Sequence, residues 1–198
     1  MTQTTATRTA TSIWQLDPAH SSIEFAVKHM MMTTVRGRFK EFRGTLTADE
    51  EHPQGCCVDV EIAVSSIDTG APDRDAHLLS PDFFDAARYP TITFRSRSVE
   101  GSVAKEGDRF RVPGQLTIKD TTMDIVLDCV FEGRGIDPWG KERAGFSCTT
   151  EIDRRDWGLK WNQALETGGI LVGNEVKIEL DVQAVEQQDA GTSREAAD

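Results

Sequence analysis

Acidic, histidine and serine side chains occur together near the start of the chain, in the segment Asp17-Pro-Ala-His-Ser-Ser22. These are the three side-chain types of a hydrolase triad. Triad members are brought together from distant positions, however, and the sequence has no Gly-x-Ser-x-Gly turn to present a nucleophile. We therefore interpret the segment as an Asx-Pro turn that leads into a strand, and we predict no catalytic residue.

Three further polar residues, His29, Arg74 and His77, are candidates for binding a ligand. His29 continues an apolar alternation and is expected to point inward, while Arg74 and His77 stand close to apolar residues that could cap a site. In one interpretation these side chains meet a phosphate or a carbonyl at the mouth of the site. In the other, His29 is a hydrogen-bonded rim residue, Arg74 forms an ion pair, and the segment around His77 packs as a lid. The sequence leaves both interpretations open.

The spacing of these groups indicates neither a metal nor a cofactor. No two histidines have the His-x-His or His-x-x-x-His spacing of metal ligands. No glycine-rich phosphate loop follows a strand and opens a helix, as a nucleotide site requires. We expect neither group.

The four cysteines, Cys56, Cys57, Cys129 and Cys148, have no C-x-x-C spacing that would suggest zinc or redox chemistry. The first residues are polar and rich in threonine, without the apolar segment of a secretory signal peptide. This favours a reducing cytoplasm, in which disulfides are rare. We therefore expect a cytoplasmic protein with four free thiols.

The elements that must position these residues follow a hydrophobic period of two, which is typical of strands with one buried face. The alternation covers residues 22–31, 58–64, 109–118, 123–132, 146–152 and 176–183, with shorter candidates at 13–16, 37–48 and 91–99. Short turns between most of these segments predict antiparallel neighbours. Within 37–48, Phe39 and Phe42 stand three apart, which breaks the alternation and predicts a bulge or bend.

A series of eight or nine such strands forms either a sandwich or a closed barrel. The length of the strands favours the barrel, so we predict an all-β fold, an eight-stranded antiparallel barrel. About eight strands enclose an interior that side chains fill or that holds one small ligand. The inward-facing residues are almost all apolar, so the barrel is either solid or holds an apolar ligand.

One segment, residues 72–90, lacks the strand alternation and predicts a small helical insertion. Ser80, followed by Pro81 and Asp82, has the sequence of a helix start: a capping hydroxyl, a proline at the first helical position and an acid in the first turn. We therefore place the start of the helix at Ser80.

Composition limits both the partners and the number of domains. The 198 residues include 22 Lys and Arg against 33 Asp and Glu, a net charge of −11, which argues against binding nucleic acid or an anionic membrane surface. No apolar run approaches the roughly 20 residues of a membrane span. We expect one domain over residues 13–185, with disordered tails at 1–12 and 186–198.

Several motifs in this sequence resemble those of the YceI family. They are Asp17-Pro-x-His20-Ser-x-Ile23-x-Phe25-x-x-x-His29 and Val35-x-Gly37-x-Phe39-x-x-Phe42-x-Gly44 near the start, Arg74-Asp-x-His77-Leu-x-Ser80-x-Asp-Phe-Phe-Asp85 and Tyr89-Pro-x-Ile92-x-Phe94 in the middle, and Val172-Gly-Asn-Glu-Val176 near the end. The resemblance implies a lipocalin-like barrel with a small helix, often dimeric, whose elongated cavity holds a polyisoprenoid chain. We accordingly expect a homodimer.

The leading hypothesis is non-catalytic binding, transport or storage of a long-chain polyisoprenoid or quinone-like lipid. The alternatives are an enzyme that acts on an isoprenoid lipid and a stress-related scaffold without a ligand. His29, Arg74 and His77 would form the polar mouth. The residues expected to line the apolar cavity are Ile23, Phe25, Val27, Phe39, Phe42, Leu79, Phe83, Phe84, Phe94, Leu116, Ile118, Ile125, Leu127, Phe146, Trp157 and Ile178.

Overall fold

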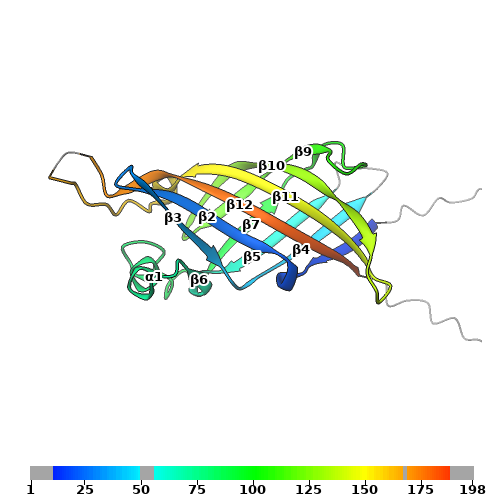
Figure 1. Ribbon diagram of the computed structural model, residues 1–198, viewed down its shortest axis with the longest axis horizontal. Helices are drawn as coiled ribbons and strands as arrows, with labels where there is room; N and C mark the ends of the chain where they lie inside the picture. The colour runs from blue at the N-terminus through cyan, green and yellow to red at the C-terminus, as the bar shows by residue number, and fades with distance from the viewer. Residues whose placement is uncertain (1–10, 50–55, 167–168, 188–198) are drawn as a thin grey trace, which may run out of the picture.

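The computed structural model describes residues 11–49, 56–166 and 169–187 and consists almost entirely of antiparallel strands (Figure 1). The strands are β1 (Thr11–Leu16), β2 (Ser22–His29), β3 (Thr33–Phe39), β4 (Phe42–Asp49), β5 (Cys57–Ala63), β6 (Ile67–Asp68), β7 (Thr91–Ser96), β8 (Glu100–Gly101), β9 (Arg109–Ile118), β10 (Thr121–Ile136), β11 (Glu142–Asp153) and β12 (Val172–Gln187). Helix α1 spans Pro72–Leu79, and single 3-10 turns lie at η1 (Pro18–His20), η3 (Val64–Ser66) and η4 (Arg154–Trp157).

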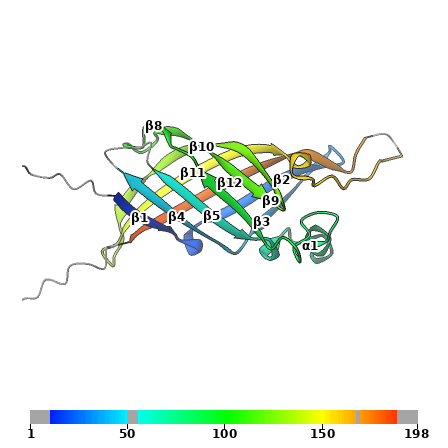
Figure 2. The same ribbon diagram turned by 180° about the vertical axis from the view of Figure 1, so that it is seen from behind.

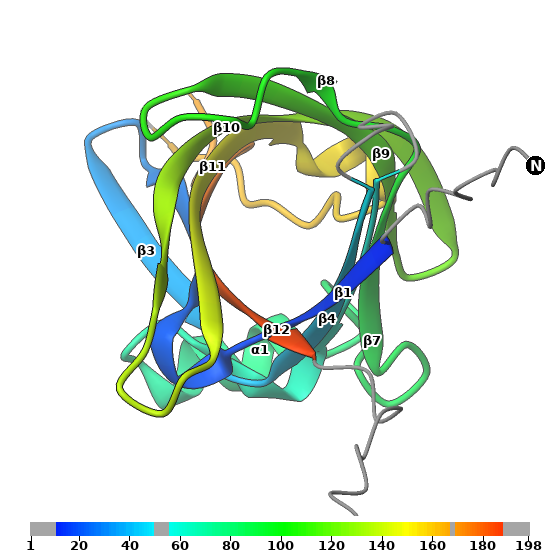
Figure 3. The same ribbon diagram turned by 90° about the vertical axis from the view of Figure 1, so that its right-hand side faces the viewer.

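Eight of the described strands close into a ring, which confirms the predicted barrel. The order around the ring is β1-β4-β5-β7-β9-β10-β11-β12, and β12 pairs again with β1 from Leu16↔Ala184 to Ile13↔Gln187. Figure 3 looks along the axis of this ring. The strands at both ends of the chain reach slightly further than expected, because Thr11 and Glu186 are already paired. The remaining parts of the predicted tails lie outside the described residues.

Interrupted strands extend the barrel beyond the closed ring. The last residues of β12 pair with β1, whereas residues 172–181 pair with β2. In the same way β4 pairs with β1 and β5, while β3 pairs with β2 and β6. The interruption between β1 and β2 follows from Pro18, which has no N–H to donate to a ladder. The interruption between β3 and β4 lies at residues 40–41, which confirms the bend predicted between Phe39 and Phe42.

The interruption between β5 and β6 leads into the helical insertion. Figures 1 and 2 both show α1 at the end of the barrel opposite the two described chain ends, on the same side as the segment that begins with η4. In the described part of the chain, no helix is long and apolar enough to span a membrane. The insertion thus lies beside the end of the barrel that is opposite the described chain ends.

The predicted start of the helix at Ser80 is wrong, because Ser80 ends α1. The helix begins at Pro72 with Asp73 and Asp75 in its first turn, and both the N–H and the hydroxyl of Ser80 donate to the carbonyl of His77. Since a residue before proline is disfavoured in the helical region, Pro81 keeps Ser80 extended, with ψ at 169°. Pro72 is therefore the proline that begins the helix, whereas Pro81 stops it.

The expectation of four free thiols is also wrong, because Cys129 and Cys148 form a disulfide. These residues stand directly opposite each other on β10 and β11. The sequence could not show this, because the two cysteines are 19 residues apart in the chain and become neighbours only through the register of the two strands, which is a tertiary property. Disulfides persist in oxidising compartments, whereas a cytoplasmic location remains a prediction from the sequence.

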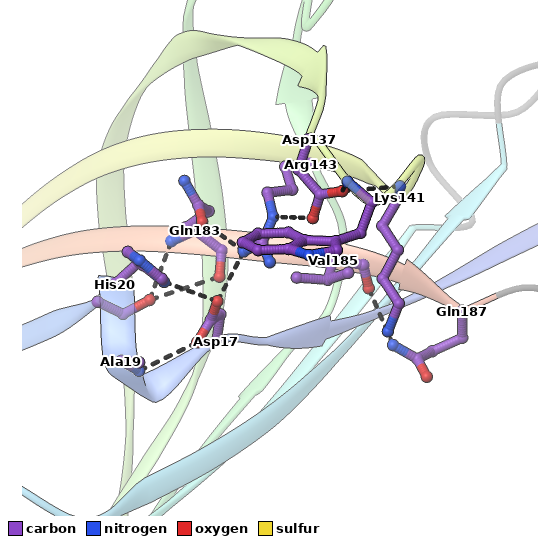
Figure 4. A network of polar contacts seen from close by, with 11 residues as sticks. Asp17, Ala19, His20, Asp137, Lys141, Arg143, Gln183, Val185 and Gln187 are labelled. Atoms are coloured by element: carbon purple, nitrogen blue, oxygen red, sulfur yellow. Dashed lines mark hydrogen bonds and ion pairs between the residues drawn. The ribbon is translucent and has the colours of Figure 1, made fainter.

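A polar network fixes the interruption between β1 and β2 (Figure 4). Asp17 accepts a hydrogen bond from the Ala19 N–H at 3.1 Å and contacts His20 Nδ1 at 2.9 Å, which confirms the predicted Asx-Pro turn. Arg143 on β11 donates to Asp17 at 2.6 Å and to Gln183 on β12 at 2.7 Å. The network thus joins the turn to two strands of the ring.

The carboxylates of this network are held ionised by their partners. Hydrogen bonds from Arg143 and then His20 lower the pKa of Asp17 to about 2. Asp137, whose side chain is 6% exposed, accepts from Arg143 Nε at 2.8 Å, which likewise lowers the pKa of this carboxyl. The side chain of Asp17 is only 17% exposed, so water screens its ion pair with Arg143 incompletely.

We predict that Asp17→Asn lowers the free energy of unfolding by about 1–2 kcal/mol at pH 7. A carboxyl whose pKa is depressed on folding stabilises the protein above its unfolded pKa and loses this contribution as the pH falls through the folded value. The difference from wild type should therefore shrink below about pH 4 and nearly vanish near pH 2. Urea unfolding at a series of pH values measures it.

Asp128→Asn is the matched control, because Asp128 is exposed on β10 and lies 3.6 Å from Arg111. We expect it to change stability by less than about 0.5 kcal/mol at every pH. Equal effects of the two substitutions at pH 7 would contradict the structural role given to Asp17.

Candidate functional site

The main cavity of the described structure runs through the interior of the barrel. Its volume is about 730 Å³, within the range of roughly 300–1,000 Å³ that small-molecule sites occupy. Every strand of the closed ring contributes residues to its wall. The alternation explains why: along β9, Phe110, Val112 and Leu116 face inward, while Arg111 and Gln115 face solvent.

Most of the residues predicted to line a cavity do border this one. They are Ile23, Phe25, Val27, Phe39, Phe83, Phe84, Phe94, Leu116, Ile118, Ile125, Leu127, Phe146 and Ile178. Phe42, Leu79 and Trp157 pack around the cavity without bordering it. Trp157 is turned toward the wall, since its indole N–H donates to the Leu116 carbonyl at 3.0 Å. Contact of these residues with a ligand stays a prediction.

Aromatic side chains fill the end of the cavity nearest α1. The ring of Phe39 lies 5.7 Å from Phe25 and 6.2 Å from Phe84, which follows the helix. Phe83 lies next to Phe84 in the chain and borders the cavity too, as does Leu78 from α1 itself. The insertion thus packs apolar side chains against this end of the cavity, and its action as a lid stays a prediction.

The three polar residues predicted at the mouth do not border the cavity. His77 is bonded to Asp82 at 3.0 Å and contacts the ring of Trp161 edge-on, at 4.6 Å between centroids. Arg74 donates to the hydroxyl and the carbonyl of Thr69, both at 2.7 Å, instead of forming the ion pair considered above. His77 and Arg74 therefore hold the insertion in place, and their contact with a ligand stays a prediction.

His29 lies at the end of β2, where it pairs with Thr33 and Val172 at the rim of the sheet. Among the residues that the structure describes, no three His, Cys, Asp or Glu side chains gather as a metal site would require. The polar residues that do border the cavity are few: Ser12, Glu24, Ser102, Arg134, Thr150 and Arg154.

Arg154 is the buried cation of this wall and was missed in the sequence. It is 4% exposed, and its guanidinium donates to the carbonyls of Gly173 at 2.9 Å, Trp161 at 3.0 Å and Val172 at 3.4 Å, and also to that of Leu159. Burial lowers the pKa of Arg154 from its ordinary value.

The position of Arg154 gives it a structural function. Its carbonyl partners belong to the segment after η4 and to the start of β12, so one side chain ties both to the barrel end. No local pattern marks such a residue, because its partners are backbone carbonyls that lie up to 19 residues away in the sequence and are brought to it by the fold. Trp14 and Leu16, by contrast, alternate along β1 and could have been predicted as lining residues.

Comparisons with known proteins give one consistent result. A family model described as a YceI-like domain matches residues 14–184. The protein YceI of Escherichia coli O157:H7 is 36% identical over 169 residues, which is 85% of this chain and 83% of the relative. YceI of Salmonella newport has the same identity and coverage.

Solved structures agree with these sequence relatives. The YCEI protein of Campylobacter jejuni superposes with a TM-score of 0.67 at 30% identity, over 81% of this chain and 90% of that one. BcnA of Burkholderia cenocepacia gives a TM-score of 0.72 at 23% identity, over 85% and 98%. A polyisoprenoid binding domain from Saccharophagus degradans gives 0.67 at 14%, over 88% and 98%. The last two show the fold alone.

We predict that Arg154→Met lowers the free energy of unfolding by about 2–4 kcal/mol, because it leaves buried carbonyls without donors. The segment after η4 should also become more accessible, so that trypsin cleaves after Lys160 faster than in wild type. Urea unfolding and limited proteolysis measure the two effects.

Arg155→Met provides a neighbouring control, since Arg155 is exposed and pairs with Asp153. Its cost should stay below about 1 kcal/mol. If both variants unfold and cleave alike, Arg154 does not anchor the segment.

Proposed function

The chain belongs to the YceI family, and on this basis we propose that it binds a long-chain polyisoprenoid or quinone-like lipid inside the barrel and carries or stores it unchanged. The observation that carries the proposal is the apolar cavity of about 730 Å³ along the barrel axis. The Saccharophagus degradans domain with the same fold is described as polyisoprenoid-binding, which supports the same class of ligand here.

The wall of the cavity fits a ligand that is apolar over most of its length. Each buried CH₂ group contributes about 0.8 kcal/mol, so an isoprenoid tail needs no charged anchor to be retained. The aromatic residues at the α1 end, Phe25, Phe39 and Phe84, add broad apolar contact area. The predicted residues that border the cavity are accordingly the ones that we propose to contact the lipid.

No specific observation favours the enzymatic alternative. General acid–base chemistry needs a titratable group within hydrogen-bonding reach of the reacting atom. His77 and Arg74 are bonded within the insertion, and Arg154, the buried one of the two arginines that border the cavity, is bonded to backbone carbonyls. A scaffold without a ligand, for its part, leaves the cavity unexplained.

The homodimer stays a prediction from the family resemblance.

The experiment is organic extraction of the freshly purified protein followed by mass spectrometry of the extract. We expect wild type to carry an isoprenoid lipid in near-stoichiometric amount. The double variant Val60→Trp with Ile178→Trp fills the cavity from β5 and β12 with apolar rings, so its lipid content should fall at least about 10-fold while the fold is kept.

Lys177→Trp is the control, because Lys177 precedes Ile178 and its side chain is exposed on the outer face. It should retain the wild-type amount of lipid. Wild-type protein without any isoprenoid or quinone lipid, or equal lipid in all variants, would refute the proposal. Time courses with isoprenyl diphosphates and quinones test catalysis, because any product in excess of the protein would refute a purely binding role.

A further inference from the structure

The Cys129–Cys148 disulfide lies in the wall of the lipid cavity. Both residues border the cavity and are 3% and 9% exposed. Their neighbours two positions away, such as Leu127 on β10 and Phe146 on β11, border it as well. The strand alternation therefore directs both sulfur atoms inward, near the middle of β10 and β11.

This position decides which reagents can reach the sulfur atoms. Thiol–disulfide exchange requires a thiolate to approach along the S–S bond. A charged thiol or a protein dithiol would have to enter an apolar cavity, and the exposed outer faces of β10 and β11, with Asp128 and Thr149, lie on the other side of the sheet. A reagent that reaches the two inward-facing sulfur atoms therefore passes through the apolar cavity, and this route favours apolar reagents.

We propose that a lipid quinone bound in the cavity oxidises the reduced pair Cys129 and Cys148 to the disulfide. The S–H bonds of the two cysteines break and one S–S bond forms. The two electrons enter the quinone ring, and the two protons go to its carbonyl oxygens, which gives the hydroquinone. The step needs no other oxidant. It rests on the proposed function, because the quinone must first occupy the cavity.

The register supports this step. Cys129 and Cys148 are direct partners in the antiparallel ladder of β10 and β11, so the disulfide forms with the barrel in place. Cys56 also borders the cavity, directly before β5. It must be removed in any test, together with Cys57, so that the thiol count reports on Cys129 and Cys148 alone.

The test uses the full chain carrying Cys56→Ser and Cys57→Ser, reduced without oxygen by an uncharged trialkylphosphine and then freed of it. Two probes with the same benzoquinone ring are compared, one with a decyl chain and one with a sulfonate in its place. Intact mass spectrometry follows the loss of two hydrogen atoms from the protein, and ultraviolet absorbance follows the hydroquinone.

We expect the decyl quinone to oxidise the pair at least about 10-fold faster than the sulfonated one, with one hydroquinone per disulfide. A saturating long-chain prenol, which has no quinone ring, should slow the decyl quinone by a similar factor because it occupies the same cavity. Adding Cys148→Ser should abolish both the loss of hydrogen and the formation of hydroquinone, since no disulfide can form.

Equal rates for the two quinones, no effect of the prenol, or a quinone adduct in place of the disulfide would overturn the inference. Native mass spectrometry of the decyl quinone complex separates this result from a failure of the proposed function. Binding without oxidation overturns the redox step alone. Absence of binding by both the decyl quinone and the prenol overturns the proposed function as well.

Discussion

An antiparallel sheet of this length must either close on itself or leave an edge of unpaired backbone groups. This chain closes, because β12 pairs with β11 along one side and with β1 and β2 along the other. Closure converts the two-residue alternation into an inside and an outside. The inside becomes a continuous apolar wall, and charged residues such as Arg111 and Asp128 stay outside. The cavity and the inward disulfide both follow from that division.

The polar groups at the ends of the barrel stabilise its irregular parts. Asp17 and Arg143 hold the interruption between β1 and β2, which Pro18 makes unavoidable. Arg154 holds the segment after η4 through backbone carbonyls, while the Arg74–Thr69 contacts hold the insertion. Strong polar contacts therefore lie at the turns and connections, and the middle of the cavity is left to apolar contacts.

The sequence was sufficient for those features that depend on local periodicity. Alternation in β9, β10 and β12 identified the inner face, and the break between Phe39 and Phe42 identified the bend. The sequence was not sufficient where the structure depends on the register of two strands or on contacts between residues distant in the chain. Cys129 opposes Cys148 only once β10 and β11 are aligned, and Arg154 is recognisable only by carbonyls brought to it by the fold. The helix was misplaced because Ser80-Pro81 suits a start and a stop equally, and the acids after Pro72 decided between them.

The pairing of β1 with β12 also sets a condition on synthesis at the ribosome. The first strand leaves the exit tunnel long before its partner, because β1 ends at Leu16 and β12 begins at Val172. At roughly 5–20 residues per second, that delay is on the order of ten seconds or more. The nascent chain can form the hairpins from β4 to β11 in order during this time, but the barrel cannot close. Chaperones that shield exposed strand edges would therefore act on this protein mainly before its last strand is made.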